Sequence, residues 1–192
     1  MMAQNPLEQE KAFGSVLDVL NAIGATYAIW GGLAVVAYGE PRFTLDMDVL
    51  LSPYGFSENL FVKRLAEMSY HVDKGTVLNA LGGGYFNVIH LPTGIKTDFY
   101  VPTEIAMRQM LQNRVWLPFD EARTAAYVSA EAAIVSKLIA YVDSHADRHL
   151  ADIASIVRVQ NENLQRSMIE QEAIRLDVLS LWRTIWAENC ES

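Results

Sequence analysis

Hydrophobic residues follow two different periods along this chain, and these periods predict both helices and strands. Over residues 7–23 apolar side chains recur three and four positions apart, which is the spacing of a helix with one buried face. Other apolar runs are short or alternate with polar residues, as strands do. We expect helices at 7–23, 33–38, 57–70, 103–112, 147–159, 164–188 and from 129, and strands at 26–30, 46–51, 85–91, 96–101, 114–119 and 124–128.

The order of these elements predicts an α/β (α+β) fold, in which a short mixed sheet is flanked by helices. The composition shifts near residue 128, and every element expected beyond it is a helix. We therefore expect a core at residues 1–128 and a helical C-terminal part at 129–192 that packs on the core, or one single domain. The chain can bury a sizeable core, because 51% of its 192 residues are hydrophobic.

Three aspartates in the expected strands carry the main chemical signal. Asp46 and Asp48 stand two apart, so a strand directs both side chains to one face. Asp98 lies in the middle of a later strand, which forms a hairpin with the strand before it. Carboxylates crowded on neighbouring strands repel one another, and a divalent cation removes that cost. In the alternative interpretation, Asp46 and Asp48 cap turns and Asp98 faces solvent on an edge strand.

Several other residues each fit two roles. Lys137 could present its ammonium group to a triphosphate, or extend along the surface to solvent. Arg42 could clamp a phosphate or pair with Glu40, and Thr44 could orient an aspartate or simply favour the strand. For Asp152 we expect an anchoring contact between helices, through Arg148.

Composition narrows the function further. The formal net charge of −8 disfavours non-specific nucleic-acid binding by the whole surface, although a short basic path at Lys63 and Arg64, or at Arg108 and Arg114, could suffice. The single cysteine, Cys190, cannot form an internal disulfide. We find no signal-peptide pattern and no apolar run of about 18 residues, so we expect a cytoplasmic protein without a membrane partner.

Three further patterns, which involve histidines, glycines and tryptophans, do not indicate an additional site. His145 and His149 stand four apart, and we expect a surface pair rather than a metal site. Residues 82–84 are glycines without a following lysine and serine or threonine, so they are no P-loop. Trp182 and Trp186 have helical spacing, which is typical of a core or an interface.

Taken together, these residues resemble a known superfamily. The pattern consists of Gly31-Gly32, Tyr38-Gly39, Arg42-x-Thr44-x-Asp46-x-Asp48 and Lys96-Thr97-Asp98, with Lys137 and Arg148-x-x-x-Asp152 further along. It resembles the nucleotidyltransferases that share their core with DNA polymerase β, and more closely the bacterial toxin-type members of the AbiEii kind. The resemblance implies a nucleotide-binding set of Gly31, Gly32, Arg42, Thr44 and Lys137, and a catalytic, metal-binding set of Asp46, Asp48 and Asp98.

The resemblance also implies a reaction. An acceptor hydroxyl would attack the α-phosphorus of a nucleoside triphosphate, with magnesium or manganese as the cofactor, and release pyrophosphate. It leaves the acceptor open among RNA such as tRNA, a protein side chain and a small molecule such as an aminoglycoside. Two alternatives are an inactive nucleotide-binding module of the same fold and a partner-binding protein, such as a toxin that pairs with a cognate antitoxin or a homo-oligomer.

Overall fold

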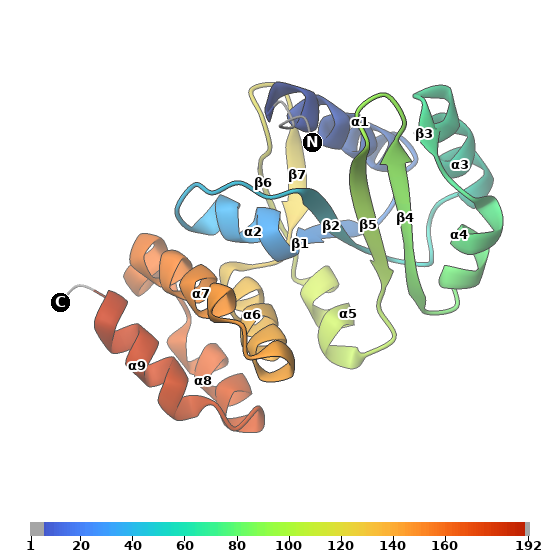
Figure 1. The fold of residues 1–192 in the computed structure, drawn as a ribbon. Coiled ribbons are helices and arrows are strands. Elements are labelled where there is room, and N and C mark those ends of the chain that lie inside the picture. Colours follow the sequence, from blue (N-terminus) through green and yellow to red (C-terminus); the bar gives the residue numbers. More distant parts are fainter. Residues whose placement is uncertain (1–5, 191–192) are drawn as a thin grey trace. The chain divides into compact units, whose positions relative to one another are not determined.

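The computed structural model describes residues 6–190, and the chain folds as two units (Figure 1). The first unit comprises the chain up to Ile29 together with Thr44–Tyr127, and the second comprises Trp30–Phe43 together with the chain from Val128 onward. Residues 30–43 therefore group with the helical C-terminal part, although they lie far from it in the sequence. A single boundary near residue 128 does not describe this grouping. Whether 1–128 and 129–192 form separate domains stays a prediction.

Within the described residues, seven strands form one sheet in the order β3-β4-β5-β2-β1-β7-β6. β2 runs parallel to β5, and β1 runs parallel to β7. β4 is antiparallel to β3 and to β5, and β6 is antiparallel to β7. The strands are β1 (Tyr27–Trp30), β2 (Asp46–Leu51), β3 (Tyr70–His71), β4 (Gly84–His90), β5 (Ile95–Val101), β6 (Val115–Pro118) and β7 (Thr124–Tyr127).

Helices of the first unit complete its core. An aromatic cluster joins a helix to the sheet, since Phe61 meets the ring of Phe99 edge-on at 5.5 Å between centroids. Phe99 in turn stacks on Phe86 of the neighbouring strand at 4.8 Å. These helices are α1 (Pro6–Ala22), α3 (Glu58–Glu67), α4 (Lys74–Ala80) and α5 (Ile105–Gln112).

The second unit is helical. The hydroxyl of Tyr38 donates to the carbonyl of Val128 at 2.8 Å, which joins the two segments of this unit. Gly39 packs so closely that a Cβ there would lie 2.4 Å from the hydroxyl oxygen of Ser155. The helices are α2 (Gly31–Tyr38), α6 (Ala130–Ser144), α7 (Asp147–Gln160), α8 (Arg166–Arg175) and α9 (Leu179–Asn189), with a 3₁₀ turn at Asn161–Asn163.

The mixed α/β architecture predicted from the sequence is confirmed, while the helix predicted over 57–70 is too long. α3 ends at Glu67, because Ser69 adopts a left-handed φ of 63° that a helix cannot continue through. Tyr70 then begins β3 instead of closing the helix. Residues 71–81 follow, for which neither a helix nor a strand was predicted. There the side chain of Asp73 accepts from the amide of Thr76 at 2.7 Å and starts α4.

The helix predicted over 164–188 is two helices, α8 and α9. The chain turns at Asp177, whose φ is 58°, and the amide of Val178 donates back to the carbonyl of Ala173 at 2.8 Å. α5 begins after Glu104, which holds its N-cap position, so this helix starts two residues later than predicted.

None of the helices formed by residues 6–190 has both the length and the apolar character needed to cross a membrane.

Candidate functional site

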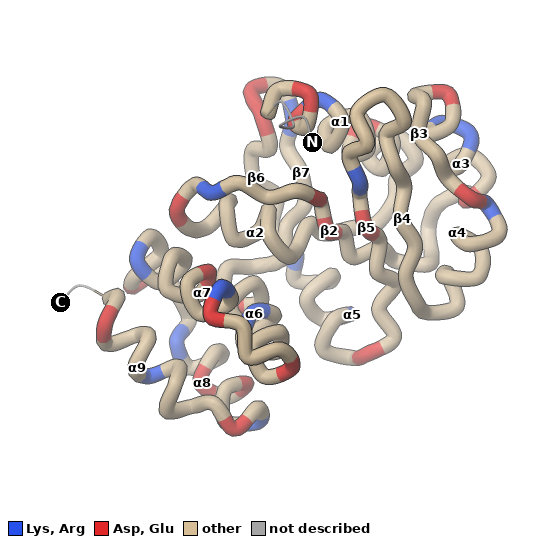
Figure 2. The backbone as a smooth tube through the Cα atoms, viewed as in Figure 1, with Lys and Arg blue, Asp and Glu red and all other residues tan. Residues whose placement is uncertain are grey.

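The pairing of β2 with β5 brings the predicted aspartates of the first unit together. In this parallel pair Asp48 lies opposite Asp98, and Asp46 lies opposite Lys96. Side chains two apart on a strand share a face, and paired residues of adjacent strands point the same way. Asp46, Asp48, Asp98 and Lys96 therefore occupy one face of the sheet, and we call them the acidic cluster. Figure 2 shows acidic positions on both strands.

Asp98 is the buried centre of this cluster, with only 4% of its surface exposed. Its Oδ2 pairs with the Lys96 ammonium at 2.6 Å, and its Oδ1 accepts from the Tyr85 hydroxyl at 2.5 Å. The same ammonium lies 3.8 Å from Oδ2 of Asp46. The alternative in which Asp98 faces solvent on an edge strand is wrong, because β5 runs between β4 and β2. Asp46 and Asp48 also lie within β2 rather than at turns.

The electrostatics follow from this crowding. The hydrogen bond to Asp98 raises the pKa of Lys96, so its ammonium stays charged at neutral pH. Burial and the hydrogen bond to Asp98 raise the pKa of Tyr85. Burial, together with the nearby carboxylates of Asp48 and Asp98, raises the pKa of Tyr100 above its ordinary value. The phenols near the cluster are thus held as neutral groups.

The acidic cluster has the donor chemistry for a divalent cation. Among residues 6–190, no three histidine, cysteine, aspartate or glutamate side chains already surround one ion position. However, carboxylate oxygens of Asp46 and Asp98 both approach one cation, the Lys96 ammonium. Carboxylate oxygens are the ligands that magnesium prefers. The residues therefore fit a metal ion, provided that Lys96 moves.

Gln9, which the sequence analysis did not single out, supports the start of β2. This buried side chain of α1 donates to the carbonyl of Thr44 at 2.7 Å and to that of Leu45 at 3.2 Å. The hydroxyl of Thr44 donates to the main-chain carbonyl of Asp46 at 3.4 Å, so it contacts the backbone of the aspartate rather than its carboxylate. No periodic pattern marks an isolated glutamine, which explains why it was missed.

In the second unit, Gly31 and Gly32 form the first turn of α2 rather than a turn before it. Gly31 has a φ of 63°, a left-handed conformation that favours glycine. The preference for glycine at this position is therefore conformational.

A second charged cluster, which we call the basic cluster, surrounds Asp152 on α7. The Arg42 guanidinium binds both carboxylate oxygens of Asp152, at 2.8 and 3.0 Å, and the Lys137 ammonium lies 2.9 Å from Oδ2. The side chains of Lys137 and Asp152 are only 11% and 9% exposed. Asp152 therefore makes the expected anchoring contact between helices, since it joins α7 to Lys137 of α6. The prediction that Arg148 is its partner is wrong, because Arg42 and Lys137 bind it instead.

Two alternatives raised for these cations are also wrong. Lys137 does not extend to solvent, because its ammonium is buried against Asp152. Glu40 pairs not with Arg42 but with Arg158, at 2.6 Å.

His149 is the third member of the basic cluster and was not predicted to be buried. It is only 8% exposed, so the expected surface pair of histidines is wrong, and its Nδ1 has no hydrogen-bond partner. Burial lowers the pKa of His149, and the positive charges of Lys137 and Arg148 lower it further. A neutral histidine thus sits beside two cations that share one carboxylate.

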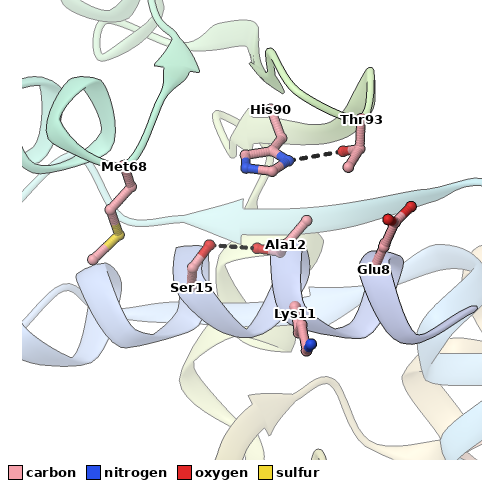
Figure 3. A pocket seen from close by; sticks show the side chains of 7 residues that line it. All are labelled: Glu8, Lys11, Ala12, Ser15, Met68, His90 and Thr93. Atoms are coloured by element: carbon pink, nitrogen blue, oxygen red, sulfur yellow. Dashed lines mark hydrogen bonds between the residues drawn. The ribbon is translucent and has the colours of Figure 1, made fainter. Parts of the chain in front are cut away.

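A pocket of about 440 Å³ in the first unit lies apart from the predicted residues (Figure 3). Three of its polar side chains are bonded within the protein: the Ser15 hydroxyl donates to the carbonyl of Ala12, and His90 shares a hydrogen bond with Thr93, each at 2.8 Å. None of the residues predicted from the sequence lines it, so it is not assigned as the active site. It is lined by Glu8, Lys11, Ala12, Ser15, Met68, His90 and Thr93.

Comparison with known proteins supports the fold. No family model and no curated protein matches the chain. The crystal structure of ANT(2'')-Ia in complex with adenylyl-2''-tobramycin is similar, with a TM-score of 0.62 and 15% identity over 88% of this chain and 97% of that one. That of an antigenic nucleotidyltransferase-like protein from Paracoccidioides brasiliensis has a TM-score of 0.58 and 14% identity over 97% of this chain and 95% of that one.

The chain has the nucleotidyltransferase fold. The solution structure of ANT(2'')-Ia agrees, with a TM-score of 0.51 and 13% identity over 96% of each chain. The fold that the resemblance implies is therefore confirmed, whereas membership of the superfamily and closeness to the AbiEii kind stay predictions.

Proposed function

We propose that this protein is a metal-dependent nucleotidyltransferase, which transfers a nucleoside monophosphate group from a nucleoside triphosphate to an acceptor hydroxyl. The observation that carries the proposal is the acidic cluster: three aspartates on one face of a parallel strand pair, in a nucleotidyltransferase fold. Two side-by-side strands with this donor set are suited to a magnesium-bound triphosphate.

Asp46, Asp48 and Asp98 would hold magnesium or manganese. The bound ion would offset the negative charge of the triphosphate and of the attacking oxygen. Asp98 would accept the proton of the acceptor hydroxyl at a carboxylate oxygen. Its Oδ1 already accepts a hydrogen bond from a hydroxyl, that of Tyr85. The hydroxyl oxygen then forms its bond to the α-phosphorus while the bond to pyrophosphate breaks.

For the second unit we propose phosphate binding. Arg42 and Lys137 are two cations on a single carboxylate, so the cluster retains a positive charge that an anionic oxygen could neutralise. The amides of Gly31 and Gly32 at the start of α2 would add hydrogen bonds. In the first unit, Thr44 would hold the backbone of Asp46.

The acceptor is proposed only by class. The similar structure of ANT(2'')-Ia holds an adenylylated tobramycin, so a small polyhydroxylated molecule is one candidate. A tRNA end or a protein hydroxyl is the other, and it would suit a toxin restrained by a cognate antitoxin. Incubation with triphosphates labelled at the α-phosphate, together with tobramycin, bulk tRNA or a protein mixture, separates these classes, because only the true acceptor gains the label.

One observation favours the inactive alternative, a nucleotide-binding module without turnover. Both carboxylate oxygens of Asp98 are already engaged, by Tyr85 and by Lys96. Such a module would bind a triphosphate, yet it would label no acceptor.

Calorimetric titration tests the proposal without knowledge of the acceptor. Each of the four magnesium–nucleoside triphosphates is added to wild type and to Asp48→Asn, with Glu67→Gln as a surface control. We expect binding by wild type and by the control, and loss of binding in Asp48→Asn. Equal binding by all three proteins, or by none, would count against a metal–nucleotide site at the acidic cluster.

A further inference from the structure

Lys96 is the one member of the acidic cluster that repels a metal ion. Its ammonium lies 2.6 Å from Oδ2 of Asp98 and 3.8 Å from Oδ2 of Asp46. These contacts follow from the register of β2 and β5, because Lys96 lies directly opposite Asp46 and two positions before Asp98. The ammonium thus neutralises carboxylate oxygens that a divalent cation would need.

The ion pair between Lys96 and Asp98 stabilises the folded protein. Asp98 has a side chain that is only 5% exposed, and a buried carboxylate without a counter-charge is strongly unfavourable. The Tyr85 hydroxyl satisfies one oxygen of Asp98 but brings no positive charge. Lys96 supplies that charge within the same chain.

The same side chain is able to leave. Lys96 is 38% exposed, and a lysine has a flexible stem that can carry its ammonium into water. Asp98 by contrast is held by its hydrogen bond to Tyr85, whose hydroxyl also accepts from Asn87 at 3.1 Å. A cation arriving at the cluster would therefore displace the lysine and leave the aspartate in place.

We propose that Lys96 is an internal counter-cation that occupies the acidic cluster when metal is absent and competes with the divalent ion for Asp46 and Asp98. The inference rests on the proposed function, since it presumes that a metal ion binds there. It goes beyond that function by making metal binding an exchange: one ammonium leaves as one divalent ion enters. A positive charge then faces Asp46 and Asp98 in both states.

The test compares Lys96→Met with wild type in nucleotide-free solution, and Lys63→Met serves as the control. Lys63 also belongs to the first unit and pairs with a carboxylate, Glu67, at 3.9 Å, but both partners are exposed. Free Mn²⁺ is followed by electron paramagnetic resonance, and the melting temperature is measured in chelator and in Mn²⁺. Neither readout depends on activity.

Removal of the competing charge should tighten Mn²⁺ binding about tenfold or more in Lys96→Met. Its melting temperature should fall in chelator and recover in Mn²⁺, whereas Lys63→Met should match wild type in both readouts. If Lys96→Met folds too poorly to measure, Lys96→Gln retains a hydrogen-bond donor for Asp98 without the charge, and it should show the same gain in affinity.

Two outcomes would overturn the inference, and they are distinguishable. Wild type that binds Mn²⁺ while neither Lys96 variant binds it more tightly refutes the exchange and leaves the proposed function standing. Absence of Mn²⁺ binding in wild type and in both Lys96 variants refutes the exchange together with the metal dependence of the proposed function.

Discussion

The two units of this protein each bury an aspartate, and they compensate its charge in opposite ways. In the first unit Asp98 shares a single lysine with Asp46, beside a third carboxylate, Asp48. In the second unit Asp152 is bound by two cations, Arg42 and Lys137. The named groups of the acidic cluster therefore keep an excess of negative charge, and those of the basic cluster keep an excess of positive charge.

The difference shows that the sign of a cluster's excess charge indicates the sign of the ligand that the cluster can bind. A buried ion pair that is balanced is complete in itself, whereas an unbalanced cluster gains from a counter-ion. The acidic cluster is suited to a cation and the basic cluster to an anion. Variants that change the balance of one cluster should therefore affect one kind of ligand and not the other.

The largest effect is expected from Asp152→Ala, which leaves the buried ammonium of Lys137 without a partner. Loss of one member of a buried pair costs about 3 kcal/mol of unfolding free energy. Urea denaturation followed by circular dichroism measures this loss. The double variant Asp152→Ala/Lys137→Met should recover part of it, because the uncompensated charge is gone. A loss below about 1 kcal/mol would place the pair among ordinary surface contacts.

A smaller effect of the opposite sign is expected from Asp48→Asn in the acidic cluster. Removal of one of three crowded carboxylates should raise the unfolding free energy in chelator by about 1 kcal/mol. The same change should weaken Mn²⁺ binding about tenfold or more, because one ligand is lost. Asp152→Asn is the matched control, and its Mn²⁺ affinity should equal that of wild type. A sharp fall in the metal-free melting temperature of Asp48→Asn would contradict an assembled acidic cluster.

The smallest effect concerns pH and His149. Burial lowers the pKa of His149 below its ordinary value of 6.5, so the unfolded chain takes up a proton at a higher pH than the folded protein does. The folded state is therefore destabilised as the pH falls below about 6.5. His149→Phe should show a smaller loss of melting temperature between about pH 7.5 and about pH 5.5 than wild type.

The sequence predicted most of the fold, and the reasons for its failures are specific. The strands, and the hairpin whose second strand contains Asp98, could be predicted because side chains alternate between the two faces of a strand. The turn at Asp177 was not, because the left-handed conformation falls on an aspartate rather than on a glycine. The helix over 164–188 was accordingly predicted without a break.

The sequence predicted the aspartates that lie together in the acidic cluster but not the ion pairs among them, and their role as a site stays a prediction. The spacing of Asp46 and Asp48 placed both on one face, and the buried Met47 and Val49 alternate with them in β2. That Lys96 lies opposite Asp46 depends on strand register, which no local pattern specifies. The contact of Arg42 with Asp152 spans 110 positions, and only tertiary packing brings them together.

The most direct test of the account is a crystal structure determined with Mn²⁺ and a non-hydrolysable nucleoside triphosphate, with the metal located by its anomalous scattering. We predict a manganese peak bound by carboxylate oxygens of Asp46, Asp48 and Asp98, and Lys96 turned away from Asp98. A map with no peak at these carboxylates, and with Lys96 still paired to Asp98, would contradict the proposal that this cluster is the catalytic centre.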